Sequence, residues 1–183
     1  MKKIFLMAAS LLTLVATAQT KKVDVSKSSI NWVGKKVTGK HEGTINIKEG
    51  ALVFKKDALK GGKFLVDMSS INSTDLQGEY KTKLDGHLKN DDFFGVEKFP
   101  IATLEFKKIA KKGNTYSITA DLTIKGIKKP TKFDLIVGKN TATTTFKIDR
   151  TLYGIKYGSG SFFDNLGDKT IDNEFELTVN LSF

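Results

Sequence analysis

Apolar and polar side chains alternate at every second position through much of the chain. From Tyr116 to Ile124 the apolar residues are separated by polar ones, and the stretch from Phe175 to Phe183 repeats this arrangement. The same alternation occurs in four shorter stretches, at residues 45–47, 64–68, 133–137 and 146–148. Successive side chains of a strand point to opposite faces, so the alternation predicts strands with one buried face and one hydrated face.

Short turns are predicted between these strands. Glycines and other turn-forming residues fall between the alternating stretches at Gly61-Gly62, Lys112-Gly113-Asn114, Gly126 and Gly138-Lys139-Asn140. Roughly eight strands joined by short turns indicate an antiparallel sandwich or an up-and-down barrel. No internal repeat or linker-like change of composition interrupts the chain. Residues 19–183 are therefore expected to form one all-β domain.

A helical connection is predicted between residues 74 and 98. Leucine or tyrosine recurs here at every fourth position, which places these side chains along one helical face: Leu76, Tyr80, Leu84 and Leu88. Thr74 or Asp75 is the expected N-cap, and Asp91-Asp92 is a second candidate helix start. Pro100 disfavours continuation of a helix past Phe99. Connections of this length in compact domains are usually functional, for example as lids.

The first eighteen residues have the three parts of a secretory signal peptide. Lys2 and Lys3 precede a mainly apolar run at residues 4–15, and Ala16-Thr17-Ala18 supplies the small residues of a cleavage site. The apolar run is too short to span a membrane as a helix. We expect residues 1–18 to be removed near Ala18/Gln19, leaving a periplasmic or secreted protein. A buried N-terminal helix is the alternative.

The chain is strongly basic, with 30 Lys and Arg residues against 20 Asp and Glu residues among 183. Nucleic-acid readers depend on arginine for bidentate contacts, yet Arg150 is the only arginine here. We therefore expect no nucleic-acid partner, and a weak contact with an anionic membrane surface stays open. The lack of cysteine excludes disulfides, thiolate metal sites and cysteine nucleophiles.

Candidate catalytic groups are few. No close His/Asp/Glu spacing around His41 or His87 supports a metal site. The run Gly158-Ser159-Gly160-Ser161 lacks the spacing of a nucleophile elbow. The sequence thus favours a protein that is not an enzyme and uses no cofactor or metal, with an enzyme acting through His87 as the alternative. An outer-membrane β-barrel is a second alternative, because the chain ends in an alternating strand at Phe183.

One block of residues resembles the central signature of the YceI-like family: His87 to Phe94, followed by Val96 to Pro100. Further matching residues lie in the expected order at Trp32, Asp67 to Ile71, Asp121 to Gly126, Lys129-Pro130, Arg150 and Tyr153 to Ile155. The resemblance covers residues 22–183. It implies an exported bacterial lipid-binding protein with an extended, antiparallel eight-stranded lipocalin-like barrel. The barrel interior would hold a long amphiphile: a polyisoprenoid, an isoprenoid quinone or a fatty-acyl lipid.

The residues expected to contact such a ligand come from the inward faces and the helical connection. Apolar inward faces suit a hydrocarbon chain, although the alternation alone fits a packed core equally well. We expect Phe93, Phe94 and Phe99 to line or close one end of the cavity. The residues expected to line the lumen are Trp32, Phe64, Phe106, Leu122, Phe133 and Phe146. His87 and Arg150 are the candidates for polar contacts at the mouth, and an ion pair with Asp149 or Asp91 is the alternative for Arg150. Pairing of two chains into a homodimer is left open.

Overall fold

The computed structural model describes residues 17–183, so positions 1–16 of the predicted signal segment lie outside the described part of the chain. In chain order the elements, with η marking short 3-10 helices, are β1 (Gln19–Lys22), η1 (Val25–Lys27), β2 (Ser29–Lys36), β3 (Gly39–Lys55), β4 (Ala58–Ser73), α1 (Gly78–Lys89), β5 (Ile101–Lys112), β6 (Thr115–Ile124), β7 (Ile127–Val137), β8 (Thr141–Asp149), η2 (Arg150–Tyr153), η3 (Gly167–Lys169) and β9 (Ile171–Ser182).

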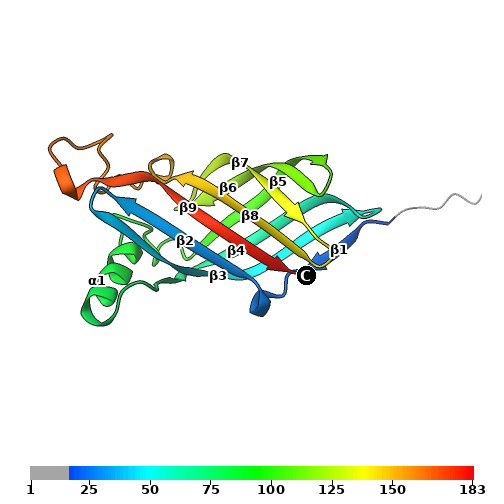
Figure 1. The fold of residues 1–183 in the computed structure, drawn as a ribbon, viewed down its shortest axis with the longest axis horizontal. Helices are drawn as coiled ribbons and strands as arrows, with labels where there is room; N and C mark the ends of the chain where they lie inside the picture. The colour runs from blue at the N-terminus through cyan, green and yellow to red at the C-terminus, as the bar shows by residue number, and fades with distance from the viewer. Residues whose placement is uncertain (1–16) are drawn as a thin grey trace, which may run out of the picture.

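Eight of the nine strands between residues 17 and 183 form a closed antiparallel barrel (Figure 1). The order around the wall is β3-β2-β9-β8-β7-β6-β5-β4, and β4 pairs back with β3. The short strand β1 extends the wall by pairing with Ala51 to Phe54 of β3. The expectation of an all-β fold built on an antiparallel eight-stranded barrel with a partly helical crossover is confirmed.

The two ends of the barrel carry different segments (Figure 1). The helix α1, the β2–β3 turn and residues 154–170, here called the rim loop, lie at one end, which we call the open end. The strand β1 and the C-terminus lie at the other end, which we call the closed end. The Val37 N–H donates to the Thr170 carbonyl at 3.1 Å, so the β2–β3 turn is tied to the rim loop.

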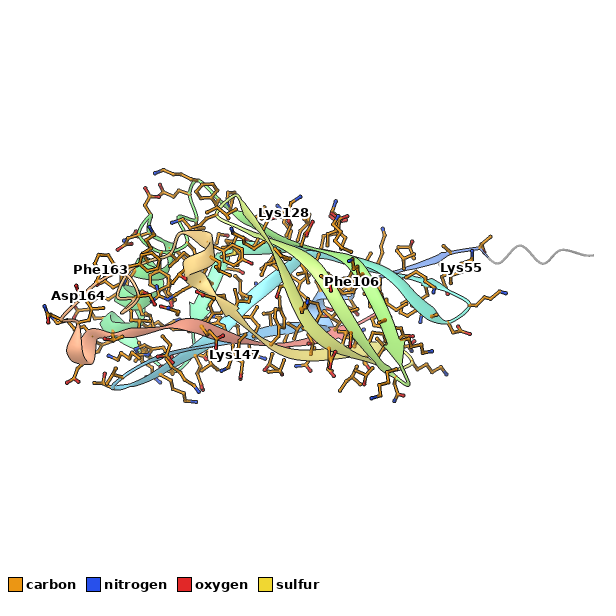
Figure 2. All side chains as sticks on the ribbon, turned by 90° about the horizontal axis from the view of Figure 1, so that it is seen from above. Lys55, Phe106, Lys128, Lys147, Phe163 and Asp164 are labelled. Carbon is orange, nitrogen blue, oxygen red and sulfur yellow. The ribbon has the colours of Figure 1, made fainter. Side chains whose placement is uncertain are left out.

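The strand alternation separates an apolar interior from a polar exterior. Every second residue of β6, from Tyr116 to Ile124, is buried, and the Ser, Thr and Asp residues between them face outward. Figure 2 shows Phe106 among the strands of the barrel and Lys128 and Lys147 on its outer surface. The predicted alternation of a dry and a wet face is therefore confirmed for these walls.

One predicted turn is wrong, because Gly61-Gly62 lies inside β4. The β3–β4 hairpin instead turns at Lys56 and Asp57, which both have positive φ angles (50° and 61°) and so match the twist of the flanking strands. Gly62 serves packing: a Cβ atom there would lie 2.6 Å from the Phe106 ring. The other predicted turns, at Gly113, Gly126 and Gly138, connect consecutive strands as expected.

The predicted helical crossover is present as α1, but its caps and its buried face differ from the prediction. Gln77 is the N-cap, whereas the Asp75 carboxylate accepts from the Glu42 N–H and pairs with His41. Leu88 is buried while Tyr80 is 76% exposed, because each four-residue step turns the position by about 40° around the helix. Asp91-Asp92 begins a series of turns, not a second helix. Within residues 17–183, no helix has the length and apolar character to cross a membrane.

Candidate functional site

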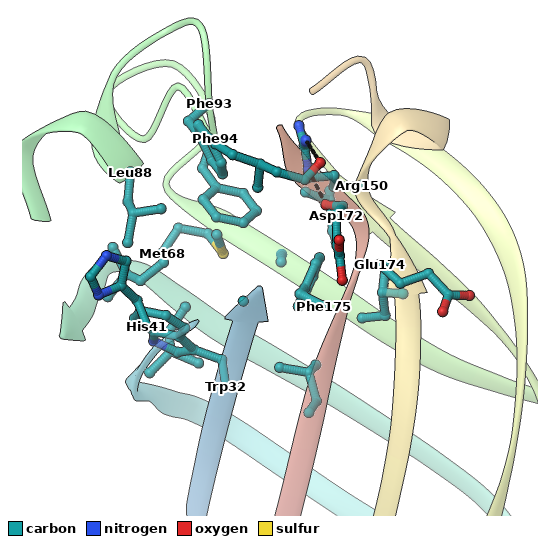
Figure 3. Close-up of a pocket in the computed structure, with 18 of the residues that line it drawn as sticks. Trp32, His41, Met68, Leu88, Phe93, Phe94, Arg150, Asp172, Glu174 and Phe175 are labelled. Atoms are coloured by element: carbon teal, nitrogen blue, oxygen red, sulfur yellow. Dashed lines mark hydrogen bonds between the residues drawn. The ribbon is translucent and has the colours of Figure 1, made fainter. Parts of the chain in front are cut away.

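An apolar cavity of about 190 Å³ occupies the open half of the barrel. Strands from both sides of the wall line it, and α1 and the segment after it cover it (Figure 3). Its apolar lining includes Trp32, Met68, Leu88, Phe94, Phe175 and Leu177. Charged lining residues belong to the strand ends and turns of the open end: Lys35, Lys36, Arg150, Asp172 and Glu174. The interior can therefore take a hydrocarbon group while its rim can contact a polar one.

Six of the residues predicted for the site line this cavity. They are Trp32, His87, Phe93, Phe94, Leu122 and Arg150. Phe99 is half-buried beside the β6–β7 turn, where a Cβ on Gly126 would lie 3.1 Å from its ring. The remaining four predicted residues, Phe64, Phe106, Phe133 and Phe146, lie deeper in the barrel and do not line the cavity.

These four deeper phenylalanines form a continuous row of rings across the barrel, which we call the aromatic floor. Adjacent ring centroids are 5.7 Å apart for Phe64 and Phe106, 5.9 Å for Phe106 and Phe133, and 4.7 Å for Phe133 and Phe146. The rings come from β4, β5, β7 and β8, so the row joins separate parts of the wall. Such spacings are those of favourable aromatic pairs.

The half of the barrel beyond the aromatic floor is filled by tightly buried side chains. Leu52, Leu59, Tyr116, Ile118 and Leu135 are all nearly inaccessible to solvent. The Tyr116 hydroxyl accepts a hydrogen bond from the Leu59 N–H at 3.4 Å, which satisfies the polar end of this buried ring. The sequence left an open cavity and a packed core as equal alternatives. The structure has both, with the cavity in the half at the open end and the packed core in the half beyond the aromatic floor.

Trp32 lies on the cavity wall in a fixed orientation. Its indole Nε1 donates to the Thr44 carbonyl at 3.2 Å. Its ring lies against Gly43, where a Cβ atom would approach within 2.5 Å of the indole. Trp32 is also the only tryptophan of the chain, so its fluorescence can report whether the cavity is occupied.

The last turn of α1 and the segment after it close one side of the rim with aromatic contacts. The His87 ring packs edge-on against Tyr157 of the rim loop at 4.4 Å and against Phe93 at 5.4 Å. Phe94 packs edge-to-face against Phe175 of β9, with ring centroids 6.3 Å apart, and both residues are labelled in Figure 3. The His87 Nε2 atom also lies 3.1 Å from the Asp92 carboxylate. These contacts hold α1, the rim loop and β9 around the cavity opening.

Arg150 is 2% exposed and holds the start of η2 against β9. Its guanidinium donates to three backbone carbonyls, those of Asp172 (3.0 Å), Ile155 (3.0 Å) and Ile171 (3.1 Å); Figure 3 draws the bond to Asp172. Burial lowers the pKa of Arg150, and the nearby carboxylates of Asp149 and Asp172 oppose this shift. The guanidinium also lies over the Phe93 ring, 5.6 Å from its centroid.

The ion pair predicted as the alternative role of Arg150 is wrong. The Asp149 carboxylate instead accepts from the N–H and hydroxyl of Thr151, which caps η2. The Asp91 carboxylate pairs with Lys98. The guanidinium is therefore used to satisfy backbone carbonyls of the rim loop (Ile155) and of the start of β9 (Ile171 and Asp172).

Several cavity residues were not among the sequence predictions. Phe175 and Leu177 belong to an alternating strand, so the sequence predicted that they face inward. It did not predict their position along the barrel axis, which places them at the cavity. His41 reaches the rim because β3 pairs with β2, and its Nδ1 lies 2.7 Å from the Asp75 carboxylate. Among residues 17–183, no group of three or more His, Cys, Asp or Glu side chains is placed to hold a metal ion.

Structural comparisons find the same barrel in several bacterial proteins. BcnA of Burkholderia cenocepacia superposes with a TM-score of 0.70 and 23% identity over 87% of this chain and 98% of that one. A polyisoprenoid binding domain from Saccharophagus degradans has a TM-score of 0.58 and 14% identity, covering 91% and 97% of the two chains. A YceI protein of Campylobacter jejuni has a TM-score of 0.54 and 19% identity, covering 100% and 91%.

Sequence relatives match over shorter segments. A UPF0312 protein of Pectobacterium carotovorum is 34% identical over 92 residues, which are 50% of this chain and 46% of the relative. A UPF0312 protein of Photorhabdus laumondii is 41% identical over 46 residues, or 25% and 24% of the two chains. The chain thus aligns with less than half the length of these relatives. Residues 22–183 match the YceI-like domain, so the chain belongs to the YceI-like domain family, as the signature at residues 87–100 predicted.

Proposed function

We propose that this protein binds the apolar tail of an amphiphile inside the barrel and leaves the polar head at the open end. The observation that carries this proposal is the cavity itself: apolar side chains line its interior, and charged side chains occur at the rim. Burial of a hydrocarbon tail gains roughly 0.8 kcal/mol per methylene before ordering costs, so about ten methylenes supply on the order of 8 kcal/mol gross. Such a gain supports useful affinity without any catalytic group.

The proposed tails are those of a polyisoprenoid, an isoprenoid quinone or a fatty-acyl lipid. The Saccharophagus domain with the same fold is described as polyisoprenoid-binding, which supports an isoprenoid among these three. The charged residues that line the cavity are three basic ones, Lys35, Lys36 and Arg150, against two acidic ones, Asp172 and Glu174, and this positive balance favours an anionic head. The protein would act as a carrier, store or sensor of this lipid.

Binding is favoured over catalysis by the way the polar rim groups are used. The buried Ser159 hydroxyl donates to the Asn173 side chain at 2.6 Å, so it fastens the rim loop to β9. Arg150 is likewise committed to backbone carbonyls. His87 packs between Tyr157 and Phe93. These arrangements are structural, which makes an enzyme acting through His87 the less favoured function.

Export to the periplasm or beyond is part of the proposal. The signal-like residues 1–18 support it, and β1 begins at Gln19, directly after the proposed cleavage point. The outer barrel face carries lysine, threonine and acidic residues, whereas an outer-membrane barrel presents an apolar band to lipid. Phe162 and Phe163 are exposed on the rim loop, and Lys156 lies over Phe162. These groups support a weak, transient contact with an anionic membrane surface at which the lipid is exchanged.

The test is native mass spectrometry of the mature protein purified without detergent, followed by extraction of any bound molecule. A stoichiometric lipid adduct is expected, and its fragments would distinguish isoprene units from acyl chains. Ala102→Phe places a ring in the cavity and should remove the adduct, whereas Ala110→Phe on the exposed part of the same strand should keep it. A bare protein mass that persists after incubation with polyprenyl phosphates, quinones and fatty acids would contradict the proposal.

A further inference from the structure

We propose that the aromatic floor sets the length of the hydrocarbon segment that the barrel encloses, at about a dozen chain carbons. This inference rests on the proposed function, because it concerns the depth of the same cavity. It assigns a role to Phe64, Phe106, Phe133 and Phe146, which the sequence had placed in the lumen lining. Their position makes them a stop at the inner end of the cavity.

The cavity ends where the floor crosses the barrel. On β4, Val66 and Met68 line the cavity, whereas Phe64, the next inward-facing residue, does not. On β6, Leu122 lines the cavity and the next inward residue, Ala120, does not. The residues beyond this level are packed and almost fully buried. A chain that enters from the open end therefore meets the rings at a common depth.

Small residues beside the rings keep the floor in place. A Cβ on Gly62 would lie 2.6 Å from the Phe106 ring, and a Cβ on Gly50 would lie 2.7 Å from the Phe64 ring. Ala120 is directly opposite Phe106 in the β5–β6 register and is fully buried. These three positions leave room for rings that span the barrel, and each ring contacts the next. A ligand tail can pass only if several packed rings move together.

The depth of the cavity follows from the strands that line it. On β9 the lining runs from Ile171 to Leu177, which is six residue steps. At roughly 3.3 Å per step and a strand tilt of about 40°, this corresponds to roughly 15 Å along the barrel axis. An extended chain advances about 1.2 Å per bond, judged from the reach of the polypeptide backbone itself. The cavity then encloses about a dozen chain carbons, the length of three isoprene units or a dodecanoyl group.

The ligand class that fits is a single-chain amphiphile with an anionic head and an enclosed segment of this length. Any longer tail keeps its remaining carbons at the open end, where the exposed rings of Tyr157, Phe162 and Phe163 lie. Added carbons beyond the limit should therefore contribute much less to affinity than those within it.

The experiment is a chain-length series read out by Trp32 fluorescence. Saturated n-alkyl carboxylates from eight to eighteen carbons are titrated into lipid-free mature protein below their aggregation concentrations. Affinity should rise by about fourfold per added methylene and then level off near twelve carbons. A rise that continues at the same slope to eighteen carbons would overturn the length limit while leaving lipid binding intact. No binding at any length, by fluorescence or by competition with polyprenyl phosphate, would overturn the proposed function and the limit with it.

Variants test whether the floor is the cause. Phe106→Leu removes part of a floor ring and should move the plateau by roughly two carbons. Phe54→Leu is the matched control, because Phe54 is equally buried but packs against Phe183 at the closed end. If Phe106→Leu does not fold, Phe146→Leu at the half-buried end of the row replaces it. A plateau that stays unchanged in the folded floor variants, or that moves equally in Phe54→Leu, would show that the floor does not set the length.

Discussion

Replacing Arg150 with methionine tests whether this side chain holds the open end of the barrel together. Methionine keeps an unbranched apolar stem of similar reach but removes all three hydrogen bonds from the guanidinium. The carbonyls of Ile155, Ile171 and Asp172 would then lose a donor at a site where Arg150 itself is 2% exposed. Both the rim loop and the first residues of β9 would be affected.

The magnitude can be bounded from these contacts. A hydrogen bond that involves a charged group contributes about 1.5–3 kcal/mol, and burial of the guanidinium, visible in its lowered pKa, offsets part of the total. We expect Arg150→Met to reduce the free energy of unfolding by about 3 kcal/mol. For a chain of this size, this corresponds to a fall in Tm of roughly 6–12 °C. Arg150→Lys should cost nearly as much, because one ammonium cannot reach three carbonyls arranged around a planar fork.

The assay is urea unfolding followed by Trp32 fluorescence, with thermal unfolding followed by circular dichroism. Lys156→Met is the control, because Lys156 is an exposed cation of the rim loop and should change the free energy of unfolding by less than about 0.5 kcal/mol. A loss below about 1 kcal/mol in Arg150→Met, or full stability in Arg150→Lys, would refute this account of the open end. Either result would show that the Arg150 guanidinium does not mainly stabilise the fold, and would leave it available to contact the polar head of the ligand.

Three further predictions concern the helix, an acidic contact and the rim loop. Gly86→Ala should raise the free energy of unfolding by about 0.5–1 kcal/mol in urea titrations, because a Cβ there meets no atom within 4 Å in α1; a destabilised variant would contradict this. For Asp85, desolvation raises the pKa, but bonds from Lys81 and the Ser73 N–H outweigh it, so the pKa is lowered overall. The ionised Asp85 carboxylate should therefore stabilise the protein above the ordinary carboxyl pKa of about 4, and this stabilisation should be lost as pH falls through the depressed pKa. The free energy of unfolding is measured against pH. The loss of stability at low pH that Asp85 causes should be absent in Asp85→Asn and still present in Glu79→Gln, whose carboxylate is exposed. The double change Phe162→Ser and Phe163→Ser should reduce sedimentation with phosphatidylglycerol vesicles severalfold while leaving ligand-induced Trp32 fluorescence unchanged; equal sedimentation of both proteins would argue against membrane contact by this loop.

The walls of the barrel were predictable because their signal is local. The alternation from residue 116 to 124 requires only that neighbouring side chains of a strand point in opposite directions, and every inward position there is buried. The helical crossover was visible for a similar reason, since spacing along one helix also depends on neighbours in sequence. The turn at Lys56 and Asp57 was missed because it contains no glycine and Lys56 is not typical of positive φ, whereas Gly61-Gly62 resembled a turn.

The division of the interior into a cavity and a packed half depended on the tertiary structure. Phe64, Val66 and Met68 form one uninterrupted apolar alternation, yet Phe64 belongs to the floor while Val66 and Met68 line the cavity. Their difference arises from what other strands contribute around them: Phe64 packs against Phe106, which contacts Phe133 in turn, whereas Val66 and Met68 face the open volume of the cavity. Height in a barrel is set by strand register, and register joins residues such as Phe106 and Ala120 through pairings between different strands. The alternation by itself therefore determined that the chain forms strands with one buried face, and which residues occupy that face, because those properties are local. It left a sandwich and a barrel open, and the barrel was implied by the resemblance to the YceI-like family. Only the tertiary structure decided which inward residues leave space and which fill it, because empty volume is the joint result of side chains from every strand around the wall.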